Sequence, residues 1–189
     1  MSHAREVTAA APRAAAPVLL GVVLLGTAVS VTLGALGATV GQPRSLPTFG
    51  FTSMQTFKAW LASLVLLLVL LQLFTALWIY GRVPWLGPAS KGVHRIHRTS
   101  GVVAIALTLP IAWYCIYAFG FDTSTPRTTV HSVLGCAFYG AFVAKLCALR
   151  VPRLPHAVVP VLGGLLFATF VGAWWLSALW WFQTVGWTR

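Results

Sequence analysis

The sequence predicts an all-α integral membrane bundle of five transmembrane helices, and three observations lead to this prediction. The 189 residues are 58% hydrophobic and only 8% charged, with a mean hydropathy of +0.84, which is too apolar for a soluble domain of this size. Apolar windows long enough to cross about 30 Å of hydrocarbon recur along the chain. The breaks between these windows hold prolines and most of the basic residues, as in membrane proteins.

The elements follow in order from this pattern. Residues 1–16 are Ala-rich without hydrophobic periodicity, and we expect a disordered cytoplasmic tail there. The apolar window 17–40 is too long for the core of a signal peptide, so we expect an uncleaved helix. Residues 17–182 form one expected transmembrane domain, followed by a short tail at 183–189. The remaining expected helices span 58–80, 91–119, 126–149 and 157–182.

Local signals support these helices. Ser90 offers an N-cap for a helix beginning near Lys91, and Thr125 offers one with Pro126 at the first helical position. Pro110 is expected to kink the third helix. Gln72 lies mid-window, where its amide needs a partner, either another helix or a ligand. Small residues recur every four positions in the first and fifth windows, which favours close helix packing. They are Gly26, Ser30, Gly34, Ala38, Gly164, Ala168 and Gly172.

The distribution of Lys and Arg predicts the orientation. With the N-terminus in the cytoplasm, nine basic residues fall inside and four outside, so the C-terminus is expected outside. The nine are Arg5, Arg13, Arg82, Lys91, Arg95, Arg98, Lys145, Arg150 and Arg153; the four are Arg44, Lys58, Arg127 and Arg189. Lys145 is expected to snorkel toward the inner surface. The excess of Arg over Lys is typical of high-GC bacteria, so we expect a multi-pass protein of the bacterial plasma membrane.

This charge pattern also limits the function. Basic residues placed for orientation argue against nucleic acid as a partner, and leave the lipid bilayer and other membrane or redox subunits as the expected partners. The two acidic residues, Glu6 and Asp122, lie outside the apolar windows, which disfavours an ion-coupled transporter. Three cysteines inside apolar windows, Cys115, Cys136 and Cys147, are interpreted as small buried hydrophobes.

Histidines on apolar helices suit another role, because neutral imidazole is a good axial ligand for haem iron. His97 and His131 are each followed four residues later by a glycine, Gly101 and Gly135, which leaves a gap on the same helix face for a flat macrocycle. Basic residues that could pair with haem propionates follow the inner rim. They are Arg95, Arg98 and Arg153.

Two segments carry a resemblance. His97-Arg98-Thr99-Ser100-Gly101 and His131-Ser132-Val133-Leu134-Gly135 resemble the His-x-x-x-Gly helix starts of ferric reductase and ascorbate-reducible b-type cytochrome transmembrane domains. The whole chain also resembles an uncharacterised bacterial five-helix membrane family. The cytochrome resemblance covers about sixty residues. It implies haem b held between two histidines and electron transfer across the membrane.

The helix directions constrain which histidines can share an iron. His97 and His131 lie near the starts of two consecutive helices, which run antiparallel. The two histidines are therefore expected at opposite faces of the membrane, separated by roughly 30 Å of hydrocarbon. His156, just before the fifth helix, is therefore the expected partner of His97 as an iron ligand, with His94 as another residue that His156 could face. His131 has no histidine partner, and Met54 is its one candidate second ligand.

Three alternatives remain open. His94, His97 and His156 could together bind copper or zinc, because imidazoles at i and i+3 on one helix can converge. Each histidine could instead be an ordinary residue of the membrane interface. The whole chain could be a non-enzymatic scaffold or accessory subunit without a cofactor, which holds its partner through the glycine faces of the first and fifth helices.

Overall fold

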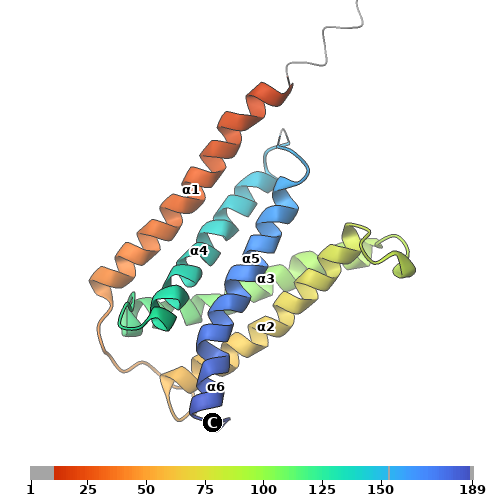
Figure 1. Cartoon of the computed structure of the whole chain (residues 1–189). Helices are drawn as coiled ribbons and strands as arrows, with labels where there is room; N and C mark the ends of the chain where they lie inside the picture. The colour runs from red at the N-terminus through yellow and green to blue at the C-terminus, as the bar shows by residue number, and fades with distance from the viewer. Residues whose placement is uncertain (1–10, 153, 188–189) are drawn as a thin grey trace, which may run out of the picture.

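The computed structural model describes residues 11–152 and 154–187, and these residues form an all-α bundle (Figure 1). The helices are α1 (Ala11–Val40), α2 (Met54–Ile79), α3 (Lys91–Tyr114), α4 (Pro126–Leu149), α5 (Val158–Trp174) and α6 (Trp180–Thr184). Single π-helical turns extend α3 as η2 (Cys115–Phe119) and join α5 to α6 as η3 (Trp175–Leu179). A 3₁₀ turn, η1 (Pro84–Leu86), lies between α2 and α3.

The described residues contain five helical spans that are long and apolar enough to cross a membrane, which confirms the predicted five-helix architecture. α1 already includes Ala11, ahead of the expected start at residue 17, within an Ala-rich stretch that favours helix. The rest of the expected N-terminal tail, residues 1–10, lies outside the described residues, as do Arg153 and the last two residues of the C-terminal tail. The orientation in the membrane stays a prediction.

Hydroxyl side chains fix where the helices begin. Ser53 accepts a hydrogen bond from the Thr56 amide at 3.1 Å, so α2 starts at Met54, four residues before the expected position. Ser90 and Thr125 cap α3 and α4 as predicted, and Thr125 forms a capping box with Thr128. α3 continues as a helix through Pro110.

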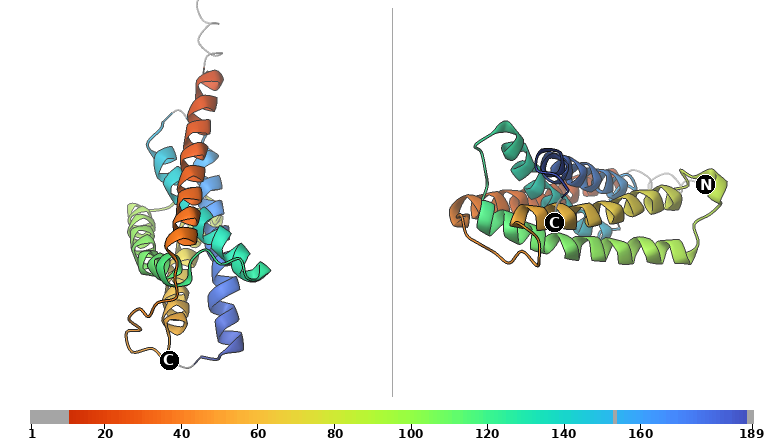
Figure 2. Two further views of the ribbon diagram at one scale, coloured as in Figure 1. Left: turned by 90° about the vertical axis from the view of Figure 1, so that its left-hand side faces the viewer. Right: turned by 90° about the horizontal axis from the view of Figure 1, so that it is seen from below.

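The helices pack as two groups (Figures 1 and 2). α4 lies between α1 and α5, whereas α2 and α3 lie side by side as a pair that crosses this group. We call the side of the bundle where α1, α3 and α5 begin the N side, and the side where they end the C side. On the N side the two groups diverge in Figure 1, and toward the C side they come together.

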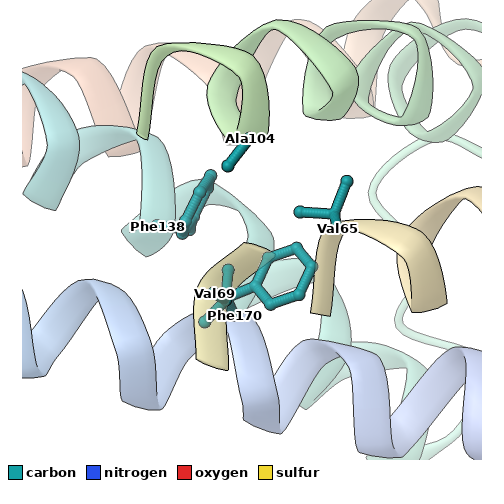
Figure 3. Close-up of a cluster of buried hydrophobic side chains, with 5 residues drawn as sticks. All are labelled: Val65, Val69, Ala104, Phe138 and Phe170. Atoms are coloured by element: carbon teal, nitrogen blue, oxygen red, sulfur yellow. The ribbon is translucent and has the colours of Figure 1, made fainter. Parts of the chain in front are cut away.

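A cluster of buried side chains joins the two groups (Figure 3). It draws on α2, α3, α4 and α5, through Val65, Val69, Ala104, Phe138 and Phe170. A second cluster on the C side packs α2 against η3 and α6, through Ala59, Ala62, Ala178 and Phe182. The groups are therefore held together by apolar packing around their crossing and on the C side.

The small residues of α1 allow close contact with α4. A Cβ atom at Gly26 would lie 2.7 Å from the carbonyl oxygen of Gly140 and 3.0 Å from Cβ of Ala144, so this contact needs glycine. The corresponding face of α5 is used only in part. Gly172 faces Leu134, whereas a Cβ at Gly164 would meet no atom within 4 Å.

Candidate functional site

The C-side halves of the helices enclose a cavity of about 430 Å³. Its lining is mainly apolar and aromatic, and includes Phe119, Tyr139, Phe170, Trp174 and Trp181. Both π-helical turns border it: η2 contributes Cys115, Ile116 and Phe119, and η3 contributes Ser177 and Ala178. Since π-helical turns occur frequently at functional sites, their meeting at one cavity marks it as the leading candidate.

Two cationic side chains border this apolar cavity. Lys58, in the second turn of α2, places Nζ 4.2 Å from the centroid of the Phe119 ring. Arg127, at the start of α4, places Cζ 3.7 Å from the centroid of the Trp180 ring and donates from Nη1 to the Leu176 carbonyl at 2.6 Å. The aromatic faces stabilise both cations in place.

Asp122 is the one carboxylate in the lining of the cavity, and its hydrogen bonds stabilise the turn in which it lies. Its Oδ1 accepts a hydrogen bond from the Ser124 amide at 2.7 Å, and its amide donates to Ser132 Oγ at 3.2 Å. Hydrogen bonds from Ser124 hold the pKa of the Asp122 carboxyl below its usual value. With Lys58 and Arg127 positive and Asp122 negative, the lining carries a net positive charge, which favours an anionic ligand.

His131 lines the same cavity in a defined tautomer. Its Nδ1 lies 3.0 Å from the carbonyl oxygen of Ala173, and because a carbonyl can only accept, Nδ1 carries the proton. In the neutral ring Nε2 then keeps its lone pair for another partner. Cys115 lies next to both His131 and Lys58, so it belongs to a polar cluster and is more than the purely apolar filler expected from its surroundings. A Cβ at Gly135 would meet nothing within 4 Å, so the gap predicted beside His131 is open.

His97 lies in a different environment, between α2 and α3. Its Nδ1 is 2.8 Å from Thr75 Oγ1, and the Thr75 hydroxyl in turn lies 2.8 Å from the Leu71 carbonyl. The gap expected beside His97 is filled, because a Cβ at Gly101 would lie 3.1 Å from Oε1 of Gln72. No space remains there for a macrocycle.

The Gln72 side chain, which lies in the middle of an apolar helix, forms hydrogen bonds with α3. Its Nε2 donates to Ser100 Oγ at 2.7 Å and also to the carbonyl oxygen of His97. Both acceptors belong to α3, so Gln72 ties α2 to α3. The structure thus gives Gln72 the helix–helix role that the sequence allowed, in place of a ligand contact.

The structure does not bring together the residues expected around a haem on the N side. His156 is exposed in the turn that joins α4 to α5, whereas His97 is half-buried against α2. The start of α3 and the α4–α5 turn both lie on the N side, where the two groups of helices diverge in Figure 1. His94, Arg95 and Arg98 are exposed near the start of α3, and Arg153 lies outside the described residues.

The other expected ligand sets are also not assembled. No group of three or more His, Cys, Asp or Glu side chains among the described residues is arranged to hold a metal ion, so the copper or zinc set of His94, His97 and His156 has no support. Met54 Sδ accepts a hydrogen bond from the Leu46 amide at 3.2 Å and lines a separate pocket with Arg44. Met54 is thus engaged away from the cavity that His131 lines.

Lys58, Arg127 and Cys115 are not predicted from the sequence to belong to one site. A usable signal was present, because Lys58 and Arg127 lie near the starts of the second and fourth apolar windows. In an alternating bundle those starts share one side of the membrane. The cation pair was instead interpreted only as part of the orientation count.

Comparison with known proteins identifies the family. Residues 18–189 match the family of unknown function DUF6529, and the chain belongs to that family. This agrees with the resemblance to an uncharacterised family, whereas the comparisons show no relationship to ferric reductases or cytochromes. Neither a curated protein nor a solved structure matches the chain.

Proposed function

We propose that this multi-pass membrane protein binds a membrane-soluble ligand with an apolar body and an anionic group, in the cavity bordered by η2 and η3. The apolar body of the ligand lies among the aromatic side chains of the lining. Its anionic group faces Lys58, Arg127 and His131.

The observation that carries this proposal is the charge balance of an otherwise apolar cavity. Lys58 lies in the second turn of α2 and points over Phe119, where the cavity begins. A cation at a membrane protein interior is costly unless it has a partner, and such residues usually mark ligand or ion sites. Asp122 is the only carboxylate of the lining and is already bound by its own turn. An anionic ligand would supply the missing partner.

Haem b is the specific ligand that a second set of observations favours. Nε2 of His131, which carries no proton in this tautomer and neighbours Cys115, would hold the haem iron, and the open space beside Gly135 leaves room on the same face for a flat macrocycle. Lys58 and Arg127 would pair with the propionates. Bound haem would supply one-electron chemistry, and the protein would then be an electron-transfer subunit. This candidate replaces the pair of His97 and His156 by a site centred on His131.

Purification in a mild detergent, followed by native mass spectrometry and an absorption spectrum, tests the proposal. We expect the wild type to retain a bound acidic amphiphile, and Lys58→Gln to lose most of it. Lys91→Gln is the matched control, because Lys91 is an exposed cation on the opposite side of the bundle. A Soret band that disappears in His131→Ala would identify the ligand as haem b.

The same experiment distinguishes the proposed ligand-binding protein from a non-enzymatic scaffold. A scaffold without a cofactor predicts that no small molecule is retained, and that Lys58→Gln and wild type behave alike. A bound acidic molecule other than phospholipid that persists unchanged in both Lys58→Gln and His131→Ala would also contradict the proposed site.

A further inference from the structure

Lys145 is another cation within a membrane span, far along α4 from the cavity. It lies in the last turns of α4, on the N side, and its side chain is half-buried. Its Nζ packs against α5, because a Cβ atom at Gly163 would lie only 3.4 Å from that nitrogen. A larger residue at position 163 would therefore contact the ammonium.

No carboxylate of the five spans can neutralise this cation, because none of the spans contains Asp or Glu. Asp122 lies in the turn before α4, whereas Lys145 lies near the other end of that helix. On α3, His97 lies close enough to interact electrostatically with Lys145, but it adds no negative charge, and its Nδ1 is already paired with Thr75. Any anionic partner of Lys145 therefore comes from outside the spans.

The surface beside Lys145 suits a lipid. α5 exposes Val161, Gly164 and Leu165 next to Gly163, and no atom lies within 4 Å of a Cβ built at Gly164. Alkyl chains can lie on this apolar face while the phosphate reaches the ammonium. Exposed basic residues at the same end of the bundle raise the local concentration of anionic headgroups. They are Arg82, Lys91, Arg95, Arg98 and Arg150.

We infer that Lys145 binds the phosphate of an anionic phospholipid whose acyl chains lie against the exposed face of α5 around Gly164. Simple snorkelling of Lys145 to water is the alternative, and it differs in a measurable way. Snorkelling requires no particular lipid, whereas a lipid site makes the protein retain anionic phospholipid through one residue.

Native mass spectrometry of the protein in detergent tests this site, with phosphatidylglycerol and phosphatidylcholine added at equal concentration. We expect the wild type to retain phosphatidylglycerol several-fold better than phosphatidylcholine. Lys145→Gln should lose most of this preference, and Lys145→Arg should keep it. Lys91→Gln is the control for general surface charge and should keep most of the preference for phosphatidylglycerol. Inorganic phosphate should not displace the lipid, which would show that the chains contribute to binding.

Several results would overturn the inference. Equal retention of the two lipids by the wild type would do so even if the Lys145→Gln variant failed to fold. If Lys145→Gln kept the preference for phosphatidylglycerol, other residues would bind the lipid. If Lys91→Gln lost as much of this preference as Lys145→Gln, general surface charge would explain the effect. Displacement by inorganic phosphate would replace the lipid site by a simple anion site. Lys58→Gln should leave the preference intact, so this test is independent of the cavity.

Discussion

Nδ1 of His131 on α4 lies 3.0 Å from the carbonyl oxygen of Ala173 on α5. This hydrogen bond leaves Nε2 of His131 as the unprotonated ring nitrogen, at a cavity that also contains Lys58 and Cys115. His97 shares the His-x-x-x-Gly pattern, but the space beside its glycine is filled by Gln72. The two motifs are therefore alike in sequence and different in what they can accommodate.

Close packing of α1 on α4 predicts opposite effects for two glycine substitutions. Gly26→Ala would place Cβ 2.7 Å from the Gly140 carbonyl oxygen, so we expect it to lower the free energy of unfolding by about 1–3 kcal/mol. Gly21→Ala is the control, because Gly21 is exposed on the same helix and its Cβ would meet no atom within 4 Å. It should be neutral or slightly stabilising, since Ala favours helix more than Gly. Denaturant titration in detergent measures both variants, and equal effects would contradict the packing.

The hydrogen bond between Gln72 and Ser100 predicts an energetic coupling between α2 and α3. A double-mutant cycle with Gln72→Leu and Ser100→Ala should show a coupling of about 1 kcal/mol in unfolding free energy. Gln72→Leu alone should lower the free energy of unfolding more than Ser100→Ala alone, because Gln72 also donates a hydrogen bond to the His97 carbonyl. Strictly additive effects of the two substitutions would show that this bond does not join the helices.

Asp122 predicts a pH dependence in the turn before α4. Because its pKa in the folded protein lies below the ordinary value of 3.8, the ionised carboxylate stabilises the fold above that pH. This contribution is lost as the pH falls through the folded-state pKa. Asp122→Asn keeps the shape without the charge, so it should melt below the wild type at neutral pH, and the difference should disappear in strong acid. Melting curves from neutral pH down to strong acid, below the folded-state pKa of Asp122, check this, and a difference independent of pH would refute it.

The count of basic residues predicts that the N-terminus is cytoplasmic and the C-terminus lies on the other side of the membrane. A reporter that is active only in the cytoplasm should therefore work when fused to residue 1 and fail when fused to residue 189. Fusing a reporter that is active only outside the cytoplasm should give the reverse pattern. Equal activity at both termini would contradict an odd number of spans.

Much of the architecture was predictable because lipid imposes strict rules on a chain. Apolar windows of about 20 residues must become helices, and a hydroxyl residue such as Ser90 or Thr125 before a window marks where the helix begins. The small residues of α1 likewise predicted a close helix contact, although not that α4 is the partner. These signals are local, so a single sequence contains them.

The candidate site was harder to predict because it depends on how the helices cross. The sequence placed His97 and His156 on one side of the membrane, but α3 packs on α2 and the α4–α5 turn lies elsewhere in the bundle. The contact between Gln72 and Gly101 could not be predicted from the sequence either, because it depends on how α2 and α3 are rotated relative to each other. The π-helical turns that border the cavity have no sequence signal that the analysis could use.

Quenching of tryptophan fluorescence by a brominated fatty acid tests the central claim most directly, because Trp174 and Trp181 line the cavity. We predict saturable quenching of the wild type by the acid, much weaker quenching by its neutral methyl ester, and a loss of the difference in Lys58→Gln. Lys91→Gln should behave as the wild type. Equal quenching by acid and ester in the wild type would contradict an anion-selective cavity.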